Sequence, residues 1–76
     1  MREVILEILQ SIREDADFEH SADYIEDGLL DSFEIVNLVS ELEEKFPIEI
    51  RGTDIVPENF TSLDMICALV AKYQEG

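Results

Sequence analysis

A serine preceded by an aspartate opens the most clearly patterned segment of the chain, which reads GLLDSFEI over residues 28–35. Asp31 and Glu34 have the spacing of a capping box, in which the side chain of each residue accepts a hydrogen bond from the backbone N–H of the other at the start of a helix. Because Asp31 fills the capping position, we expect Ser32 to be the first helical residue, with a hydroxyl that the cap does not use.

A free hydroxyl at this place could carry a phosphate-linked group. The first N–H groups of a helix lack partners within the helix, and the positive end of the helix dipole favours a phosphate. The neighbouring carboxylate of Asp31 adds negative charge and opposes this effect. The local chemistry therefore permits a phosphodiester on Ser32 without requiring one.

Ser32 together with His20 and an acid could also suggest a hydrolase. However, the chain has no Gly-x-Ser-x-Gly turn, no Gly-rich anion-binding loop and too few residues to build an oxyanion hole beside a substrate pocket. His20 lies in an acidic loop, where we expect it to be solvated. Cys67 lies on the apolar stripe of a predicted helix and is expected to be a core residue. We therefore expect a protein that is not an enzyme.

The acidic segment before GLLDSFEI partly matches the spacing of a calcium-binding loop. Oxygen-bearing side chains occupy positions 1, 3, 5, 7, 9 and 12 of that spacing: Asp15, Asp17, Glu19, Ser21, Asp23 and Glu26. Position 6, which favours glycine, is His20, and no helix is expected directly after position 12. Calcium binding remains a minor alternative, and we expect no specific metal site.

Charge narrows the classes of partner. The 76 residues include 19 acids and 5 Lys or Arg residues, for a net charge of -14, and the stretch from Glu14 to Glu44 holds 12 acids and no Lys or Arg. Such a field repels nucleic acids and anionic membranes, and attracts basic proteins. With one cysteine, no signal-peptide pattern and no apolar run of roughly 20 residues, a cytoplasmic location is expected.

Hydrophobic spacing predicts a single all-α domain over residues 1–76. An amphipathic helix is expected from Arg2 to about Arg13, followed by a long connection that isolated apolar residues pin to the core. A second helix should run from Asp31 to Phe46, with Leu30 and Ile35 packing across its start as a hydrophobic staple. The apolar residues that are expected to pin the connection between the two helices to the core are Phe18, Tyr24, Ile25, Leu29 and Leu30.

The last third is expected to contain a short helical turn and a third main helix. The turn is predicted between Asp54 and Asn59, with Pro57 inside it. The helix is predicted to begin after Thr61, with Thr61 and Asp64 forming a weaker capping signal. The pattern therefore predicts three main helices and one short helix.

The segment DGLLDSFEIVNLVSELEEKFPIEI resembles the acyl carrier protein family, and PENFTSLDMICALV is similar to the last part of the same domain. The likeness extends over essentially all 76 residues. It implies a small four-helix bundle in which a phosphopantetheinyl transferase, with Mg²⁺, moves 4'-phosphopantetheine from coenzyme A to Ser32. The arm ends in a thiol that holds an acyl or aminoacyl group as a thioester.

The resemblance also implies how partner enzymes bind. They would present basic docking surfaces to acidic residues of the second helix and its start, which here are Asp31, Glu34, Glu43 and Glu44. Phe33 and Val36 would add an apolar patch near Ser32, as would Leu30 if the staple leaves it partly exposed. The partners expected are the transferase and the enzymes that load and process the cargo, acting on a monomeric carrier.

The sequence departs from the pattern of fatty-acid carriers at several positions. Asn37 and Lys45 stand where acids are usual, and Ser40 stands where an exposed methionine is frequent. The Gly-Gly-x-Ser pattern of typical peptidyl carriers is absent. Fatty-acid, polyketide, nonribosomal peptide and D-alanylation pathways stay open, with specialised metabolism favoured. The rival hypothesis is an acidic helical adaptor that binds a basic protein and carries no arm.

Overall fold

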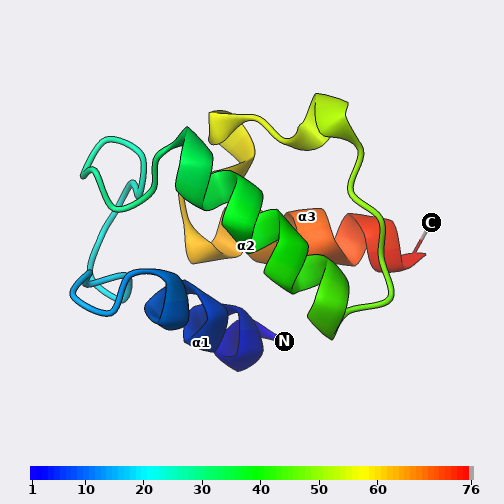
Figure 1. Ribbon diagram of the computed structural model, residues 1–76, viewed down its shortest axis with the longest axis horizontal. Coiled ribbons are helices and arrows are strands. Elements are labelled where there is room, and N and C mark those ends of the chain that lie inside the picture. Colours follow the sequence, from blue (N-terminus) through cyan, green and yellow to red (C-terminus); the bar gives the residue numbers. More distant parts are fainter. Residues whose placement is uncertain (76) are drawn as a thin grey trace.

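The computed structural model describes residues 1–75, and over this range the chain is helical with no strand. The main helices are α1 (Arg2–Ile12), α2 (Ser32–Lys45) and α3 (Leu63–Glu75), as Figure 1 shows. Two short 3-10 turns, η1 (Gly52–Asp54) and η2 (Pro57–Phe60), lie between α2 and α3. The prediction of a small all-α bundle with three main helices is confirmed.

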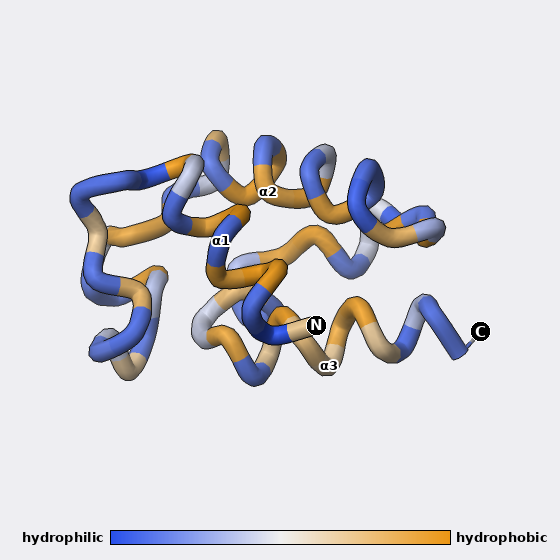
Figure 2. The backbone as a smooth tube through the Cα atoms, turned by 90° about the horizontal axis from the view of Figure 1, so that it is seen from below, coloured by the Kyte–Doolittle hydropathy of each residue, from blue (hydrophilic) through white to orange (hydrophobic). Residues whose placement is uncertain are grey.

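The core is formed where the apolar stripes of the three helices meet. Helix α1 packs against α2 and α3, while η2 contacts both α2 and α3. Figure 2 shows the hydrophobic side of α2 turned towards α3 and its hydrophilic side turned outward. Helices of this length are marginal alone, so burial of these stripes holds them. The buried residues of the helices are Ile5, Ile8, Leu9, Ile35, Leu38, Val39, Leu42, Ile66, Leu69 and Val70.

The connection between α1 and α2 is held to this core as predicted. Phe18 and Tyr24 are 2% and 1% exposed, and their rings meet edge to face with centroids 5.1 Å apart. The Tyr24 hydroxyl donates to the Phe18 carbonyl at 3.0 Å, and the Tyr24 N–H donates to the Thr61 carbonyl at 2.7 Å. The connection therefore reaches α2 along a path fixed by buried contacts.

The segment before α3 differs from its prediction in two respects. It forms two 3-10 turns where one was expected, and Pro57 is the first residue of η2 and not an internal one. Proline suits a first position because it has no N–H to leave unpaired and its φ is already helical. The cap of α3 was also misplaced by one residue: the Ser62 hydroxyl, and not that of Thr61, accepts the Met65 N–H, at 3.2 Å.

A polar cluster joins η1 to the end of α3. The Tyr73 hydroxyl donates to the Asp54 carboxylate, and Lys72 Nζ lies 3.0 Å from the same group. The Arg51 N–H donates to the Tyr73 hydroxyl oxygen at 3.1 Å. These contacts, the hydroxyl of Tyr73 first and then Lys72, lower the pKa of Asp54.

Among the helices of residues 1–75, none has the length and apolar character that crossing a bilayer requires.

Candidate functional site

The start of α2 carries the complete capping box that the sequence predicted. Asp31 is the N-cap residue in extended conformation, with φ -112° and ψ -179°. Its Oδ1 accepts the Glu34 N–H at 2.8 Å, and Glu34 Oε1 accepts the Asp31 N–H at 3.1 Å. Leu30 and Ile35, the staple positions, are both buried in the core. The orientation of the first helical turn is therefore fixed on both its polar and its apolar side.

Ser32 is the first residue of α2 and is exposed. Within residues 1–75 its hydroxyl has no hydrogen-bond partner, and neither do the N–H groups of Ser32 and Phe33. The N–H groups of Glu34 and Ile35, by contrast, are both taken by Asp31. The helix start thus offers a free hydroxyl beside two free donors, which suits a phosphate bonded to the hydroxyl oxygen.

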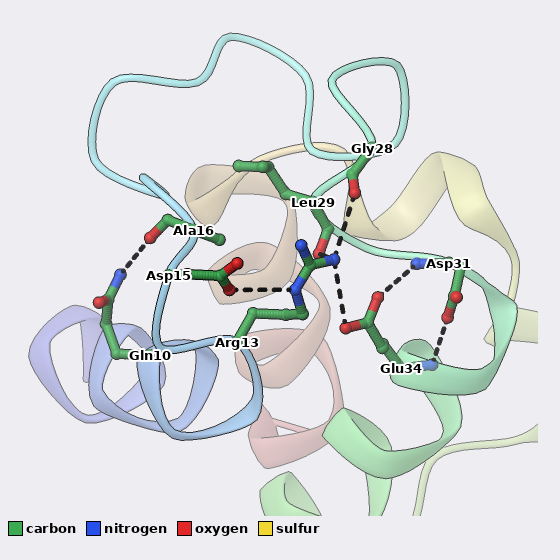
Figure 3. Close-up of polar contacts among 8 residues, drawn as sticks. All are labelled: Gln10, Arg13, Asp15, Ala16, Gly28, Leu29, Asp31 and Glu34. Carbon is green, nitrogen blue, oxygen red and sulfur yellow. Dashed lines mark hydrogen bonds and ion pairs between the residues drawn. The ribbon is translucent and has the colours of Figure 1, made fainter.

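Arg13, the C-cap residue that follows α1, reaches across to this helix start (Figure 3). Its Nη1 lies 3.4 Å from the carbonyl oxygens of Gly28 and Leu29 and 3.5 Å from Glu34 Oε2. Its Nε lies 3.5 Å from Asp15 Oδ1. The Glu34 side chain is only 14% exposed, so its carboxylate is largely used by Arg13 and the cap. Sequence analysis missed Arg13, whose contacts join residues distant in sequence.

Gly28 makes the turn that leads into the site. It has a φ of 74°, in the left-handed region that glycine enters without a side-chain penalty. After the turn, the N–H groups of Leu29 and Leu30 donate to the Tyr24 carbonyl at 2.9 and 3.1 Å. The buried anchor Tyr24 and the turn at Gly28 together set where Asp31 begins the helix.

Two large apolar side chains stand exposed near Ser32. Phe33 is 73% exposed and Val36 is 58% exposed, and both lie on the first part of α2. Leu30, expected to join them if the staple left it partly exposed, does not do so because it is 2% exposed. Its side chain is part of the core, so the surface patch consists of Phe33 and Val36.

The four acids expected to face partners are not equivalent. Asp31 and Glu44 are exposed, whereas Glu34 and Glu43 are partly buried. Glu43 Oε2 accepts the Ile50 N–H at 2.9 Å and so holds the segment after α2 against the helix. Of these four acids, Asp31 and Glu44 therefore present the more accessible carboxylates.

The alternative chemistries find little support in the geometry. Asp17 binds His20 through Nδ1 at 2.9 Å, and Asp23 Oδ1 accepts the N–H groups of Ile25 and Glu26. No group of three or more potential metal-binding side chains converges anywhere in the described range 1–75. His20 is 81% exposed and pairs with Asp17, away from any contact with Ser32.

Cys67 is partly buried against the core, in line with its expected role. Burial raises the pKa of its thiol above the usual value, because the thiolate loses solvation. A protonated, half-covered thiol is a poor nucleophile. Cys67 is therefore a packing residue of α3.

Comparison with known proteins gives a family. The chain is 30% identical over 67 residues to the D-alanyl carrier proteins of Bacillus mycoides (strain KBAB4), Bacillus cereus (strain B4264) and Bacillus anthracis (strain CDC 684 / NRRL 3495). Each alignment spans 86% of this chain and 85% of the relative. No family model and no solved structure matches. The helical fold and these relatives together show that the chain belongs to the acyl carrier protein family and is a carrier, not an enzyme.

Proposed function

We propose that this protein carries an acyl or aminoacyl group as a thioester on a 4'-phosphopantetheine arm attached to Ser32. The proposal rests on which side chains form the cap at the start of α2. Asp31 and Glu34 complete the cap, which leaves the exposed Ser32 hydroxyl without an internal partner. A hydroxyl that contributes nothing to the fold can be esterified without loss of stability.

The attachment reaction would be catalysed by a phosphopantetheinyl transferase. The Ser32 oxygen would bond to the phosphorus of coenzyme A that bears pantetheine, 3',5'-ADP would leave, and the hydroxyl proton would pass to a base of the transferase. The free N–H groups of Ser32 and Phe33 would be available to donate to the resulting phosphate, beside Asp31. The arm, once attached, supplies the thiol that bears the cargo.

Partner enzymes would dock on the exposed face around Ser32. The patch of Phe33 and Val36 offers apolar contact, and the acids Asp31 and Glu44 offer charge, with smaller contributions from the partly buried Glu34 and Glu43. Exposed ion pairs contribute at most about 1 kcal/mol each, while charge complementarity speeds association. A carrier that serves several enzymes in turn needs this combination of fast binding and fast release.

An aminoacyl cargo is the first to test. The relatives reported above are named D-alanyl carrier proteins, and the departures at Asn37, Ser40 and Lys45 separate this chain from fatty-acid carriers. We propose D-alanine as the leading candidate cargo, ahead of fatty-acid, polyketide and nonribosomal peptide intermediates. Location in the cytoplasm, where coenzyme A and the loading enzymes are found, belongs to the same proposal.

Mass spectrometry of the intact protein tests attachment. The purified chain is incubated with coenzyme A, Mg²⁺ and a transferase of broad specificity, and a gain of about 340 Da, the mass of one arm, is expected. Ser32→Ala should abolish the gain. Ser40→Ala, which removes another exposed hydroxyl from the same helix, should leave it intact.

An unmodified wild-type protein, or a gain that survives Ser32→Ala, would overturn the proposal. The rival adaptor function would then gain support from a basic partner whose binding is unchanged by Ser32→Ala. If attachment occurs, D-alanine and fatty acyl groups are offered in parallel with their activating enzymes, and the loaded masses identify the cargo class.

A further inference from the structure

One guanidinium contacts both the segment that leads into α2 and the first turn of α2. Arg13 Nη1 lies within 3.5 Å of two backbone carbonyls that precede the helix, those of Gly28 and Leu29, and of the Glu34 carboxylate within it. Ser32 lies between these two points of attachment in the chain. Figure 3 shows the guanidinium placed between the loop segment at Gly28 and Leu29 and the first turn of α2.

The contacts of Arg13 hold the end of a long, acidic connection against the start of α2. It extends from Arg13 to Asp31, and long connections open more easily than the elements that they join. Arg13 is also the last Arg or Lys before Lys45, and His20, the one other basic side chain of this stretch, pairs with Asp17 and not with Glu34. Without Arg13, Glu34 would face Asp31 and the two carbonyls with no positive partner.

The link between Arg13 and the cap runs through one side chain. Glu34 uses Oε1 to accept the Asp31 N–H and Oε2 to meet Arg13. A guanidinium that holds Oε2 therefore fixes the orientation of the carboxylate whose other oxygen completes the capping box. Because the Arg13 side chain is 34% exposed and that of Glu34 only 14% exposed, this pair is screened less than a surface pair.

We propose that Arg13 is a positioning residue for the modification of Ser32: it clamps the end of the connection to the first turn of α2 and so holds the hydroxyl in the orientation that the transferase requires. This inference rests on the proposed function of Ser32. It assigns to the end of α1 a role in a reaction that takes place at the start of α2.

Hydrogen exchange tests the clamp without any modification. In Arg13→Gln, the amides of Leu29, Leu30 and Asp31 should exchange about fivefold faster than in the wild type. Arg2→Gln is the matched control, because it removes the same charge from the other end of α1, where Arg2 pairs with Asp64. It should leave these amides unchanged. Equal exchange in all three proteins, or equal acceleration by both variants, overturns the inference.

Transferase kinetics then separate positioning from general destabilisation. Arg13→Gln should lower kcat about fivefold, because the hydroxyl is less often aligned, and leave KM for the carrier unchanged, because the docking face is intact. A merely structural role would lower the concentration of folded carrier, which raises the apparent KM and leaves kcat unchanged. That result, or kinetics equal to those of Arg2→Gln, would contradict the proposal.

Glu34→Gln provides a second variant should Arg13→Gln fold poorly. Its amide oxygen can still accept the Asp31 N–H, while the charge that faces Arg13 is lost. The effects of the two single variants on amide exchange should not add: the amides should exchange no faster in the double variant than in either single variant. Additive effects would overturn the clamp. If the wild type is not modified at all, the proposed function fails, while the exchange experiment still decides the role of Arg13.

Discussion

At the scale of single residues, the site depends on which side chain performs the capping. Asp31 accepts the Glu34 N–H and is met in return by Glu34, and this exchange leaves the Ser32 hydroxyl unused. The spacing of Asp31 and Glu34 in the sequence was enough to predict this, because a capping box is a local motif formed by two residues three positions apart. The chemistry proposed for Ser32 follows from that local order.

Replacement of Asp31 tests the cap directly. Asp31→Ala should lower the free energy of unfolding by about 1 kcal/mol, because one N–H at the start of α2 loses its acceptor. Urea denaturation measures the change. Asp31→Asn, which keeps an acceptor oxygen, should cost less, and Glu44→Ala, at an exposed position of the same helix, should change stability by less than about 0.5 kcal/mol. Equal losses for Asp31→Ala and Glu44→Ala would contradict the capping role.

Other residues of the site were beyond prediction from the sequence. The contact between Arg13 and Glu34 depends on the path of the whole connection, which no local spacing specifies. The burial of Leu30 and the bond of Glu43 to the Ile50 N–H likewise follow from how distant segments pack. For this reason the four acids proposed for docking appeared equivalent in the sequence and differ in their exposure in the structure.

At the scale of elements, the connection between α1 and α2 owes its course to a few buried side chains. The three helices were predictable from their apolar spacing, and so were the anchors Phe18 and Tyr24. The 3-10 turns and the Ser62 cap were predicted less well, because turns of three or four residues carry too few apolar positions to show a period. Helices of several turns can therefore be recognised from their apolar period, whereas single turns cannot.

The Tyr24 hydroxyl gives a test of the anchored connection. Tyr24→Phe should lower the free energy of unfolding by about 1 kcal/mol, because the buried Phe18 carbonyl loses its donor. Tyr24→Ala should cost about 3–5 kcal/mol through lost burial. Thermal and urea denaturation report both. Phe33→Ala removes an aromatic ring that is 73% exposed and serves as the control, with little expected change. Comparable losses at Tyr24 and Phe33 would show that the anchor is not buried in solution.

The junction of η1 and α3 should respond to pH. The pKa of Asp54 is lowered by the Tyr73 hydroxyl and by Lys72, so the stabilisation is complete above the ordinary carboxyl value of 3.8 and is lost as the pH falls below it. Tyr73→Phe removes the largest contribution. Urea denaturation of both proteins should show a difference in stability at pH 7 that narrows towards pH 3. A difference that widens on acidification would contradict this assignment.

At the scale of the whole molecule, the net negative charge opposes folding. A net charge of -14 on 76 residues produces mutual repulsion, which dissolved salt screens. We expect the thermal midpoint to rise by several degrees as sodium chloride is raised from about 10 mM to about 200 mM, since the Debye length falls from roughly 30 Å to below 10 Å. Differential scanning calorimetry measures the shift. A midpoint that falls over this range would show that attractive pairs, and not repulsion, dominate the electrostatics.

Attachment of the arm at Ser32 can be tested by fragmentation of the modified protein. The chain has five serines, at positions 11, 21, 32, 40 and 62, and tandem mass spectrometry of the peptides distinguishes them. After cleavage at Glu26 and Glu34, which separates Ser32 from Ser21 and Ser40, the added mass of about 340 Da and the characteristic loss of pantetheine from it are expected only on the peptide that contains Ser32. Added mass on a peptide with any other serine, and an unmodified Ser32, would contradict it.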